Sequence, residues 1–370
     1  MIYLSPPYAS EEEKKALLHA ADSGWIAPVG PQLDRWEKEL SDWTGRHVVL
    51  LNSGTAAIHL ALILAGVKRD DTVLVASHTC NASVNPILYL GAKPHFIDCE
   101  QETWNMDPEL LEDTIRELRE SDTPIAAIIG VDIYGTPAHW NRLGEIAENW
   151  SIPLIQDSAE AMGGVFGDQP VGVQAEFGVW SFNGNKIIST SGGGALICDT
   201  EERAEQARKL ATQAKERTDY YWHTQVGYTY RMSNLLAGFG HAQWENLSSR
   251  MDARVKHFER YRSFFQSKGI RVEYSINPNA RPNRWLSAFY LPEVDVQRLI
   301  EFLAHRDIEA RRFWKPMHQQ PIYQGFEANL NGCSDRLFEH GICLPCGAGN
   351  TDEQIDEVLV ALDAYFNASS

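Results

Sequence analysis

The chain has 370 residues, of which 44% are apolar and 22% charged, a composition typical of a globular protein long enough for two domains. Its formal net charge of -17 argues against binding to nucleic acid or to an anionic membrane surface. No apolar run reaches the roughly 18 residues of a membrane span, and no signal-peptide pattern is visible at the N-terminus. We therefore expect a cytoplasmic protein without membrane partners.

Short apolar runs alternate with helical patterns between residues 47 and 216. Seven runs have the length and composition of strands buried on both faces: HVVLLN, DTVLVAS, KPHFIDC, IAAIIGVDIYG, IPLIQD, FGVWSF and GALICD. Helical patterns such as GTAAIHLALILAG and PAHWNRLGEIAENW lie between several of them. This alternation predicts an α/β fold with a mostly parallel sheet covered on both sides. Ligands of such sheets bind beyond the carboxyl ends of the strands.

A long helix is predicted next, from about Leu235 to Lys268. Strand and helix patterns then resume in NRWLSAFYL and DVQRLIEFLAHRDIEARRFW, and DEQIDEVLVALDAYF forms a final helix. The expected organisation is a large α/β domain over residues 1–245 and a smaller C-terminal α/β domain over residues 246–370.

Six cysteines are scattered along the chain, and only Cys343 and Cys346 have a spacing typical of metal or redox motifs. A zinc site would need a second pair or nearby histidines, and a redox motif would open a helix after a strand. Neither context is present, so we expect no metal site.

The first candidate for chemistry is LNSGTAAIHL, where a strand pattern ends and Gly54 and Thr55 open a helix. Free backbone N–H groups and the positive end of the helix dipole suit a phosphate there. An ordinary N-cap is the alternative. The lysine of a nucleoside-triphosphate loop is missing.

The second candidate is IPLIQDSAE, in which Asp157 directly follows a buried strand and Glu160 lies three residues further on. Asp157 either caps a turn or holds a cationic ring nitrogen through a charge-assisted hydrogen bond.

The third candidate is SFNGNKIISTSGGG, where Lys186 follows the strand that ends at Ser181. A lysine amine is a poor nucleophile at its ordinary pKa of about 10.4 unless it is desolvated or converted to a Schiff base. A glycine-flanked turn at the edge of a sheet provides such a setting, and Ser181 adds a hydroxyl for a phosphate.

Together these candidates supply the phosphate, ring-nitrogen and aldehyde anchors of pyridoxal 5'-phosphate (PLP), in order along one sheet. The chain resembles the DegT/DnrJ/EryC1/StrS family of sugar aminotransferases, which have the aspartate aminotransferase fold (fold type I). The resemblance covers essentially the whole chain. It is carried by GWIAPVGPQLDRWE, LNSGTAAIHLAL, GAKPHFID, QDSAEAMGG, FGVWSFNGNKIISTSGGGALI, GYTYRMSNLLAGFG and RRFWKPMHQQPIY.

The resemblance implies a role for each matching residue. Lys186 would carry the cofactor, Asp157 would hold its ring nitrogen and Glu160 would contact its ring. The remaining implied contacts are Gly54, Thr55 and Ser181 to the phosphate, Asn234 from the second subunit of a homodimer, and Trp25, Ile26, Ala27, Lys315, His318 and Gln319 to the sugar nucleotide. Lys315 belongs to a basic cluster with Arg311 and Arg312, which is either solvated or in contact with the substrate's diphosphate.

One position departs from the family's pattern. Cys80, in ASHTCNASVNP, stands where relatives mostly place an aromatic ring against the cofactor. A cysteine cannot stack, although its sulfur can contact a π face.

The implied reaction is transfer of an amino group from glutamate to C4 of a UDP-linked 4-keto-6-deoxy-N-acetylhexosamine, because SFNGNK, NRWLS and MHQQPIY resemble the bacillosamine-type branch. The alternatives are a dTDP- or GDP-linked keto-sugar, aminated at C3 or C4, and a non-catalytic regulator that binds PLP or a sugar nucleotide. Lys186 argues against the family's dehydratases, which have histidine there.

Overall fold

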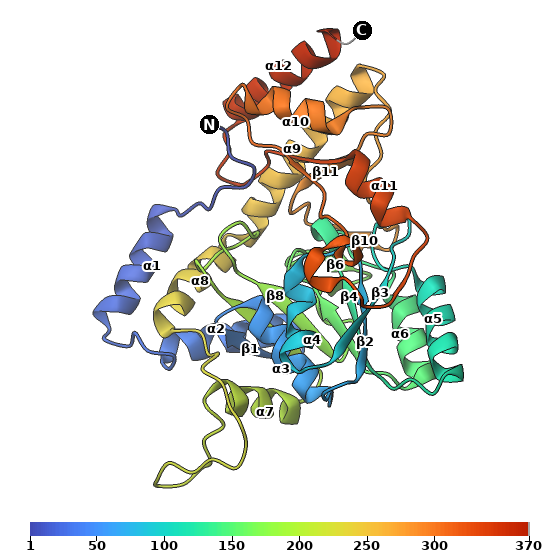
Figure 1. The fold of residues 1–370 in the computed structure, drawn as a ribbon. Coiled ribbons are helices and arrows are strands. Elements are labelled where there is room, and N and C mark those ends of the chain that lie inside the picture. The colour runs from blue at the N-terminus through green and yellow to red at the C-terminus, as the bar shows by residue number, and fades with distance from the viewer. Residues whose placement is uncertain (369–370) are drawn as a thin grey trace.

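The computed structural model describes residues 1–368, and it divides into a part built on a large sheet and a smaller part beside the C-terminal helix (Figure 1). The large sheet has eight strands in the order β1-β9-β8-β5-β4-β2-β3-β13. Its strands are β1 (His47–Leu51), β2 (Thr72–Ala76), β3 (Lys93–Ile97), β4 (Ile125–Val131), β5 (Leu154–Asp157), β8 (Phe177–Ser181), β9 (Gly194–Cys198) and β13 (Ala328–Asn329).

All seven strands expected between residues 47 and 216 are present, and most of the sheet is parallel. The exception is β9, which pairs antiparallel with both β1 and β8. The α/β architecture expected from the sequence, built on a mostly parallel sheet, is therefore confirmed.

Helices cover both faces of this sheet, which explains the continuous apolar runs. In β1, Val49 and Leu51 pack in the same cluster as the helix α3 (Gly54–Leu64). The alternate residues Val48 and Leu50 pack with the helix α2 (Pro31–Thr44). The other helices of this part are α1 (Glu11–Asp22), α4 (Asn85–Tyr89), α5 (Pro108–Glu120), α6 (Trp140–Trp150) and α7 (Glu201–Ala211).

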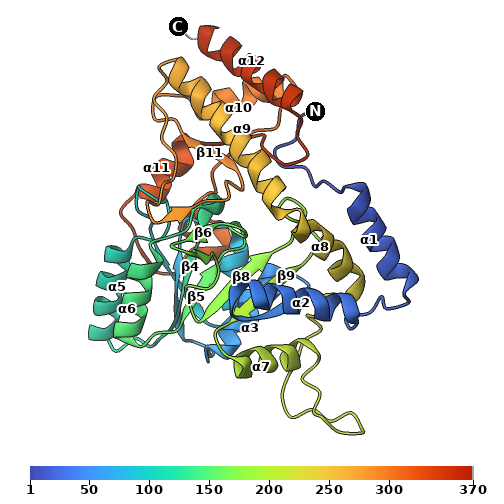
Figure 2. The ribbon, with the colours of Figure 1, turned by 180° about the vertical axis from the view of Figure 1, so that it is seen from behind.

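The helix expected from Leu235 to Lys268 is two helices, α8 (Asn234–Glu245) and α9 (Leu247–Ser267). Asn246 separates them with φ -100° and ψ 12°, and its side-chain amide donates to the Ala242 carbonyl at 3.0 Å. The α8 helix packs against α1, and α9 continues toward the smaller part (Figure 2).

The smaller part contains a three-stranded antiparallel sheet in the order β11-β14-β12. Its elements are β11 (Ser287–Tyr290), α10 (Val296–Ala304), β12 (Arg311–Arg312), α11 (Cys333–His340), β14 (Gly341–Leu344) and α12 (Asp352–Ala368). A second small sheet joins β10 (Ala280–Arg281), β6 (Val165–Phe166) and β7 (Gln169–Pro170).

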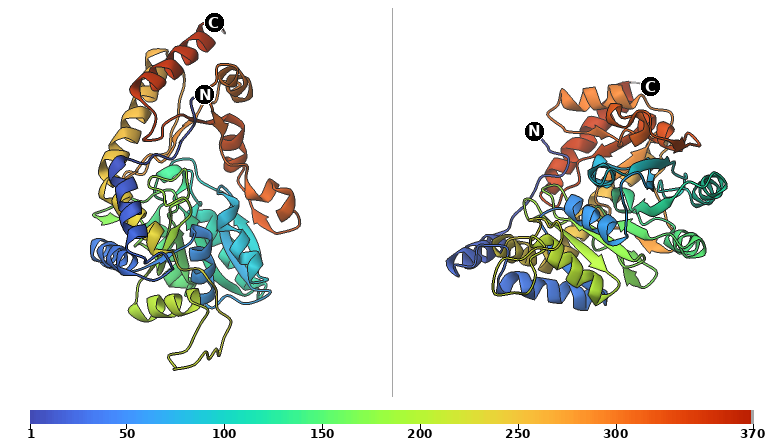
Figure 3. Two further views of the ribbon diagram at one scale, coloured as in Figure 1. Left: turned by 90° about the vertical axis from the view of Figure 1, so that its left-hand side faces the viewer. Right: turned by 60° about the horizontal axis from the view of Figure 1, so that its bottom comes forward.

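The chain passes between the two parts more than once (Figure 3). Ile2 bonds with Asp307 and Glu309 and packs in the core of the smaller part. In the other direction, β13 leaves the C-terminal half and pairs with β3 of the large sheet. Within residues 1–368, no helix is both long and apolar enough to cross a membrane.

Candidate active site

The candidate residues gather where three elements of the large sheet end or begin. The strand β5 ends at Asp157 and is parallel to β8, which ends at Ser181. The carboxyl ends of the two strands therefore lie at the same edge of the sheet, as predicted for a ligand site in this fold. The helix α3 begins shortly after β1, and its first residue, Gly54, lies beside Ser181.

The start of α3 and the end of β8 approach each other closely because the residues there are small. A Cβ atom on Gly54 would lie 3.1 Å from Ser181 Cβ, and one on Gly194 would lie 2.5 Å from the Gly54 amide nitrogen. Ser53 caps the helix by accepting the Ala56 N–H at 3.0 Å, so the N-cap role is real. This corner joins Gly54, the adjacent Thr55 and Ser181 at the positive end of a helix dipole, and it fits a phosphate group.

The carboxylate of Asp157 is buried and held at both oxygens. Ser83 Oγ donates to Oδ2 at 2.7 Å, and the Ala159 N–H donates to Oδ1 at 3.1 Å. Burial raises the pKa of Asp157, while the Ser83 and Ala159 hydrogen bonds and the charge of Lys186 oppose that rise. A buried carboxylate fixed in this way fits a protonated ring nitrogen, with which it would form a charge-assisted bond.

Lys186 lies in the expected turn, in which its backbone N–H donates to the Asn183 carbonyl at 2.9 Å. Its Nζ atom is 3.5 Å from Glu160 Oε1 and 4.0 Å from the centroid of the Trp285 ring. Burial raises the pKa of Glu160, and the charge of Lys186 and the hydrogen bond from the Tyr134 N–H oppose it. That N–H donates to Glu160 Oε2 at 2.7 Å.

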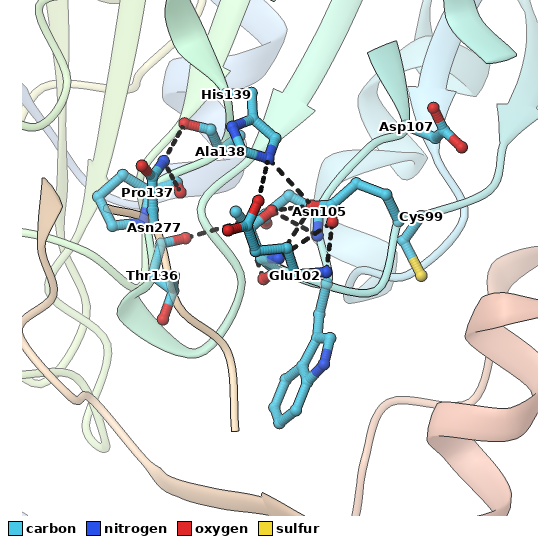
Figure 4. A network of polar contacts seen from close by, with 12 residues as sticks. Cys99, Glu102, Asn105, Asp107, Thr136, Pro137, Ala138, His139 and Asn277 are labelled. Atoms are coloured by element: carbon cyan, nitrogen blue, oxygen red, sulfur yellow. Dashed lines mark hydrogen bonds and ion pairs between the residues drawn. The ribbon is translucent and has the colours of Figure 1, made fainter. Parts of the chain in front are cut away.

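Tyr134 adopts a left-handed backbone conformation, with φ 51°, which is unfavourable for a bulky residue. A polar network holds the turn in place, and Figure 4 shows its side chains. Asn105 donates to the Thr136 carbonyl at 2.9 Å, and Asn277 donates to the Ala138 carbonyl at 3.0 Å. The strained turn thus aims a backbone N–H at the buried carboxylate of Glu160.

Cys80 lies close enough to Lys186 and the two carboxyl groups to interact with their charges. Burial raises the pKa of its thiol to about 11, and the charges of Lys186, Glu160 and Asp157 all act on it. The thiol is therefore protonated near neutral pH. The structure places Cys80 beside the residues expected to surround a cofactor ring, and direct contact with that ring stays a prediction.

We expect Cys80→Phe to leave amino transfer intact and to slow the loss of cofactor, because an aromatic ring at this position adds stacking worth roughly 0.5–1.5 kcal/mol. The check is the rate of cofactor release on dilution, followed by absorbance. Cys198→Ala, at a buried cysteine in β9, is the control. Faster release from Cys80→Phe would contradict the prediction.

Asn234 and residues 25–27 form a second group. The Asn234 side-chain amide donates to the Trp25 carbonyl at 2.7 Å, and its backbone N–H donates to the Ala27 carbonyl at 2.8 Å. Its Oδ1 accepts the first free N–H groups of α2, from Gln32 and Leu33. The side chains of Trp25 and Ile26 are exposed. Among the described residues, no hydrogen bond or ion pair joins Asn234 to Lys186.

Lys315, His318 and Gln319 form a third group. Lys315 Nζ donates to Gln319 Oε1 at 2.9 Å, and Gln319 Nε2 donates to Asp335 Oδ1 at 2.6 Å. One nitrogen of His318 lies 3.1 Å from the same Asp335 oxygen, and the other lies 2.7 Å from Ser77 Oγ. Ser77 is three residues before Cys80, so this group borders the turn that also carries Cys80 and Ser83.

Sequence reasoning missed the residues that support the lysine and the carboxylates, namely Ser83, Tyr134, Asn283, Trp285 and Arg254. Each comes from a loop or helix far from its partner in the sequence. Only Asn283 and Trp285 lie in a segment, NRWLS, that carries part of the resemblance. In the described part of the chain, no three histidine, cysteine or acidic side chains are placed to hold a metal ion.

A mostly parallel sheet whose edge joins a lysine, a buried aspartate and a small-residue helix start has the groups with which a PLP-dependent transferase would hold its cofactor. The chain belongs to the DegT/DnrJ/EryC1/StrS aminotransferase family, whose model matches residues 7–363.

Three relatives match most of the chain. The PLP-dependent aminotransferase EpsN of Bacillus subtilis (strain 168) is 41% identical, with 99% of this chain and 96% of the relative covered. The GDP-perosamine synthase of Vibrio cholerae is 32% identical, with 99% and 100% covered. The UDP-4-amino-4,6-dideoxy-N-acetyl-beta-L-altrosamine transaminase of Campylobacter jejuni serotype O:2 is 30% identical, with 87% and 86% covered.

Among solved structures, the sugar aminotransferase Spr1654 of Streptococcus pneumoniae, in its PMP form, superposes with a TM-score of 0.90 at 26% identity. The alignment covers 98% of each chain. The protein is thus a PLP-dependent sugar aminotransferase, and the expectations of an enzyme, of this cofactor and of this family are confirmed.

Proposed function

We propose that the enzyme transfers an amino group from glutamate to C4 of a UDP-linked 4-keto-6-deoxy-N-acetylhexosamine. The observation that carries the chemistry is the placement of Lys186 beside Glu160, at the sheet edge where Asp157 and Ser181 end their strands. The UDP-linked sugar is supported by the Campylobacter jejuni relative, whose name gives a UDP-linked amino sugar.

In this proposal the bound PLP serves as the electron sink when a proton leaves the α-carbon of the amino donor. The corner of Gly54, Thr55 and Ser181 binds the phosphate. Asp157, fixed by Ser83 and Ala159, keeps the ring nitrogen protonated. Lys186 Nζ, once released from the cofactor, accepts the α-carbon proton and returns a proton to a carbon atom as general base and acid.

The competing substrate is a GDP-linked keto-sugar. It is supported by the GDP-perosamine synthase of Vibrio cholerae, whose 32% identity is slightly higher than the 30% of the Campylobacter jejuni relative. A screen of UDP-, dTDP- and GDP-linked 4-keto-6-deoxy sugars with glutamate, read by mass spectrometry, separates the two. We expect the UDP-linked N-acetylated sugar to have the highest kcat/KM. Faster turnover of the GDP- or dTDP-linked sugar would replace this substrate with the alternative, and the position of the new amine would decide between C3 and C4.

We also propose a homodimer in which both chains build each active site. Support comes from the segment between α7 and α8, which extends away from the rest of the chain (Figures 1 and 3). It exposes large apolar side chains that a lone chain leaves in water, namely Tyr220, Tyr221, Trp222 and Val226. The residues Trp25, Ile26 and Val29 near the start of α2 are exposed as well. A twofold interface would cover such surfaces with the same surfaces of a second copy.

Mixing two inactive variants tests the shared site. Lys186→Ala lacks the proposed cofactor lysine, and Asn234→Ala lacks the side chain expected at the partner's cofactor. After subunit exchange, heterodimers should contain one intact site, so part of the activity should return. A fully active monomer in solution, or a mixture that stays inactive although exchange is shown by mass spectrometry, would contradict the proposal.

Asn234→Ala should also lower the free energy of unfolding, by about 2 kcal/mol, because it removes the cap of α2 and the bond to Trp25. Denaturant unfolding measures the change. Asn234→Asp keeps the acceptor oxygen that caps α2 and should lose about half as much or less. Equal losses in both variants would show that the cap contributes little.

A further inference from the structure

The amine of Lys186 lies between two side chains that come from different parts of the chain. The carboxylate of Glu160 is 3.5 Å from Nζ on one side, and the ring centroid of Trp285 is 4.0 Å from Nζ on the other. The lysine side chain is 11% exposed and the glutamate side chain is 5% exposed. An ammonium ion over a tryptophan face gains a cation–π attraction that strengthens as water is excluded.

Trp285 is held at three points, so its face keeps one orientation. The indole Nε1 donates to the Asn185 carbonyl at 2.8 Å, directly beside the lysine in sequence. The backbone N–H of Trp285 donates to Asn283 Oδ1 at 2.8 Å, and its carbonyl accepts from Arg254 Nη1. Arg254 also donates to the Lys186 carbonyl at 3.4 Å, so the ring and the lysine backbone are tied to the same guanidinium.

Asn283 forms hydrogen bonds to the segments that carry Trp285 and Glu160. Its Oδ1 accepts from Trp285, while its Nδ2 donates to the backbone carbonyls of Glu160 and Met162, both at 2.9 Å. Gly135 makes room for this side chain, because a Cβ atom there would lie 1.9 Å from Asn283 Oδ1. One buried amide therefore fixes the spacing between the tryptophan and the glutamate.

Two carboxyl groups and one guanidinium lie near Lys186. Glu160 and Asp157 both interact with the charge of Lys186, and the Cys80 thiol is neutral near pH 7. The opposing group is the Arg254 guanidinium, which binds the lysine's carbonyl oxygen. Glu160 and the Trp285 face therefore contact the amine itself, whereas the Arg254 cation contacts the backbone carbonyl.

We propose that Trp285 and Glu160 form a resting site for the Lys186 amine when it is protonated between its proton-transfer steps and is not joined to the cofactor. Trp285 and Asn283 are then positioning residues of the transfer reaction. The inference rests on the proposed role of Lys186 as the cofactor lysine. In the half of the cycle when the cofactor carries the donated amino group, this site keeps Nζ between Glu160 and Trp285 instead of free in solvent.

The test uses the full chain loaded with pyridoxamine 5'-phosphate, in which every lysine amine is free. Trace acetylation with acetic anhydride, followed by mass spectrometry, measures the labelling of Lys186 relative to the exposed Lys38. Near neutral pH, Trp285→Leu should raise this ratio on the order of tenfold, because the ammonium form loses its aromatic partner. Trp285→Phe retains a π face and should change the ratio much less.

Labelling is repeated above the ordinary lysine pKa of about 10.4, where little of the ammonium form remains to be stabilised. This measurement distinguishes a loss of cation–π stabilisation from easier access of the reagent to Lys186. The increase in Trp285→Leu should largely disappear at that pH. An increase of equal size at both pH values would mean that the leucine only opens a path for the reagent. That outcome would overturn the proposal.

Glu160→Gln provides a second variant of nearly equal volume, for the case that Trp285→Leu does not fold. It should raise the neutral-pH labelling ratio in the same direction, and an unchanged ratio in folded Glu160→Gln would overturn the proposal. Borohydride reduction of the PLP form reports separately on the proposed function. A pyridoxyl group on another lysine would refute the role of Lys186 in catalysis, whatever its labelling shows.

Discussion

Lys186→Ala is expected to abolish amino transfer, with a fall in kcat of at least about 10⁴-fold, the upper end of what proton transfer alone contributes. The variant loses both the covalent anchor of the cofactor and the group that moves the proton. The protein should remain folded, because the backbone contacts of Lys186 to Asn183 and Arg254 do not need the side chain. Turnover of keto-sugar and glutamate, read by mass spectrometry, measures the loss.

Borohydride reduction of the wild-type enzyme with PLP should leave a pyridoxyl group on the peptide that contains Lys186. Lys38→Ala, which removes an exposed lysine on α2, is the matched control and should keep both the label and the activity. Retained turnover in Lys186→Ala, or a label on a different peptide, would show that the cofactor lysine lies elsewhere.

The sheet could be predicted from the sequence because its strands are buried on both faces, which leaves uninterrupted apolar runs such as Val48 to Leu51. The direction of β9 could not be predicted this way, because parallel and antiparallel buried strands have the same composition. The division of the long helix at Asn246 was also missed. Its cause is one residue with φ -100° and ψ 12° inside an otherwise helical pattern.

The reactive side chains of the candidate site were accessible to sequence reasoning because each directly follows a strand or opens a helix. Asp157 and Ser181 close their strands, and Gly54 starts α3. The residues that hold these side chains carry no such local signal. Ser83, Asn283 and Trp285 acquire their roles only when loops distant in sequence fold against β5 and β8.

The second large effect is expected at Asp157, whose carboxylate has no cation among its hydrogen-bond and ion-pair partners in the described chain. Its partners are Ser83 Oγ and the Ala159 N–H, and both are donors. An asparagine at this position keeps one acceptor oxygen, so it could still accept one of these two hydrogen bonds. Asp157→Asn therefore removes the negative charge with little change in shape. Any loss of activity reports mainly on that charge.

Asp157→Asn should lower kcat by about 10²–10³-fold, the range seen when a preorganised electrostatic partner of the reacting group is removed. Without the carboxylate, the ring nitrogen is no longer held protonated, so proton removal from the donor slows. Ser83→Ala keeps the charge and loses one hydrogen bond, worth about 1 kcal/mol, so its loss should be roughly tenfold or less. Single-turnover absorbance changes with glutamate measure both variants. If Asp157→Asn stays within a few-fold of the wild type, or falls no further than Ser83→Ala, the carboxylate does not act on the cofactor ring as proposed.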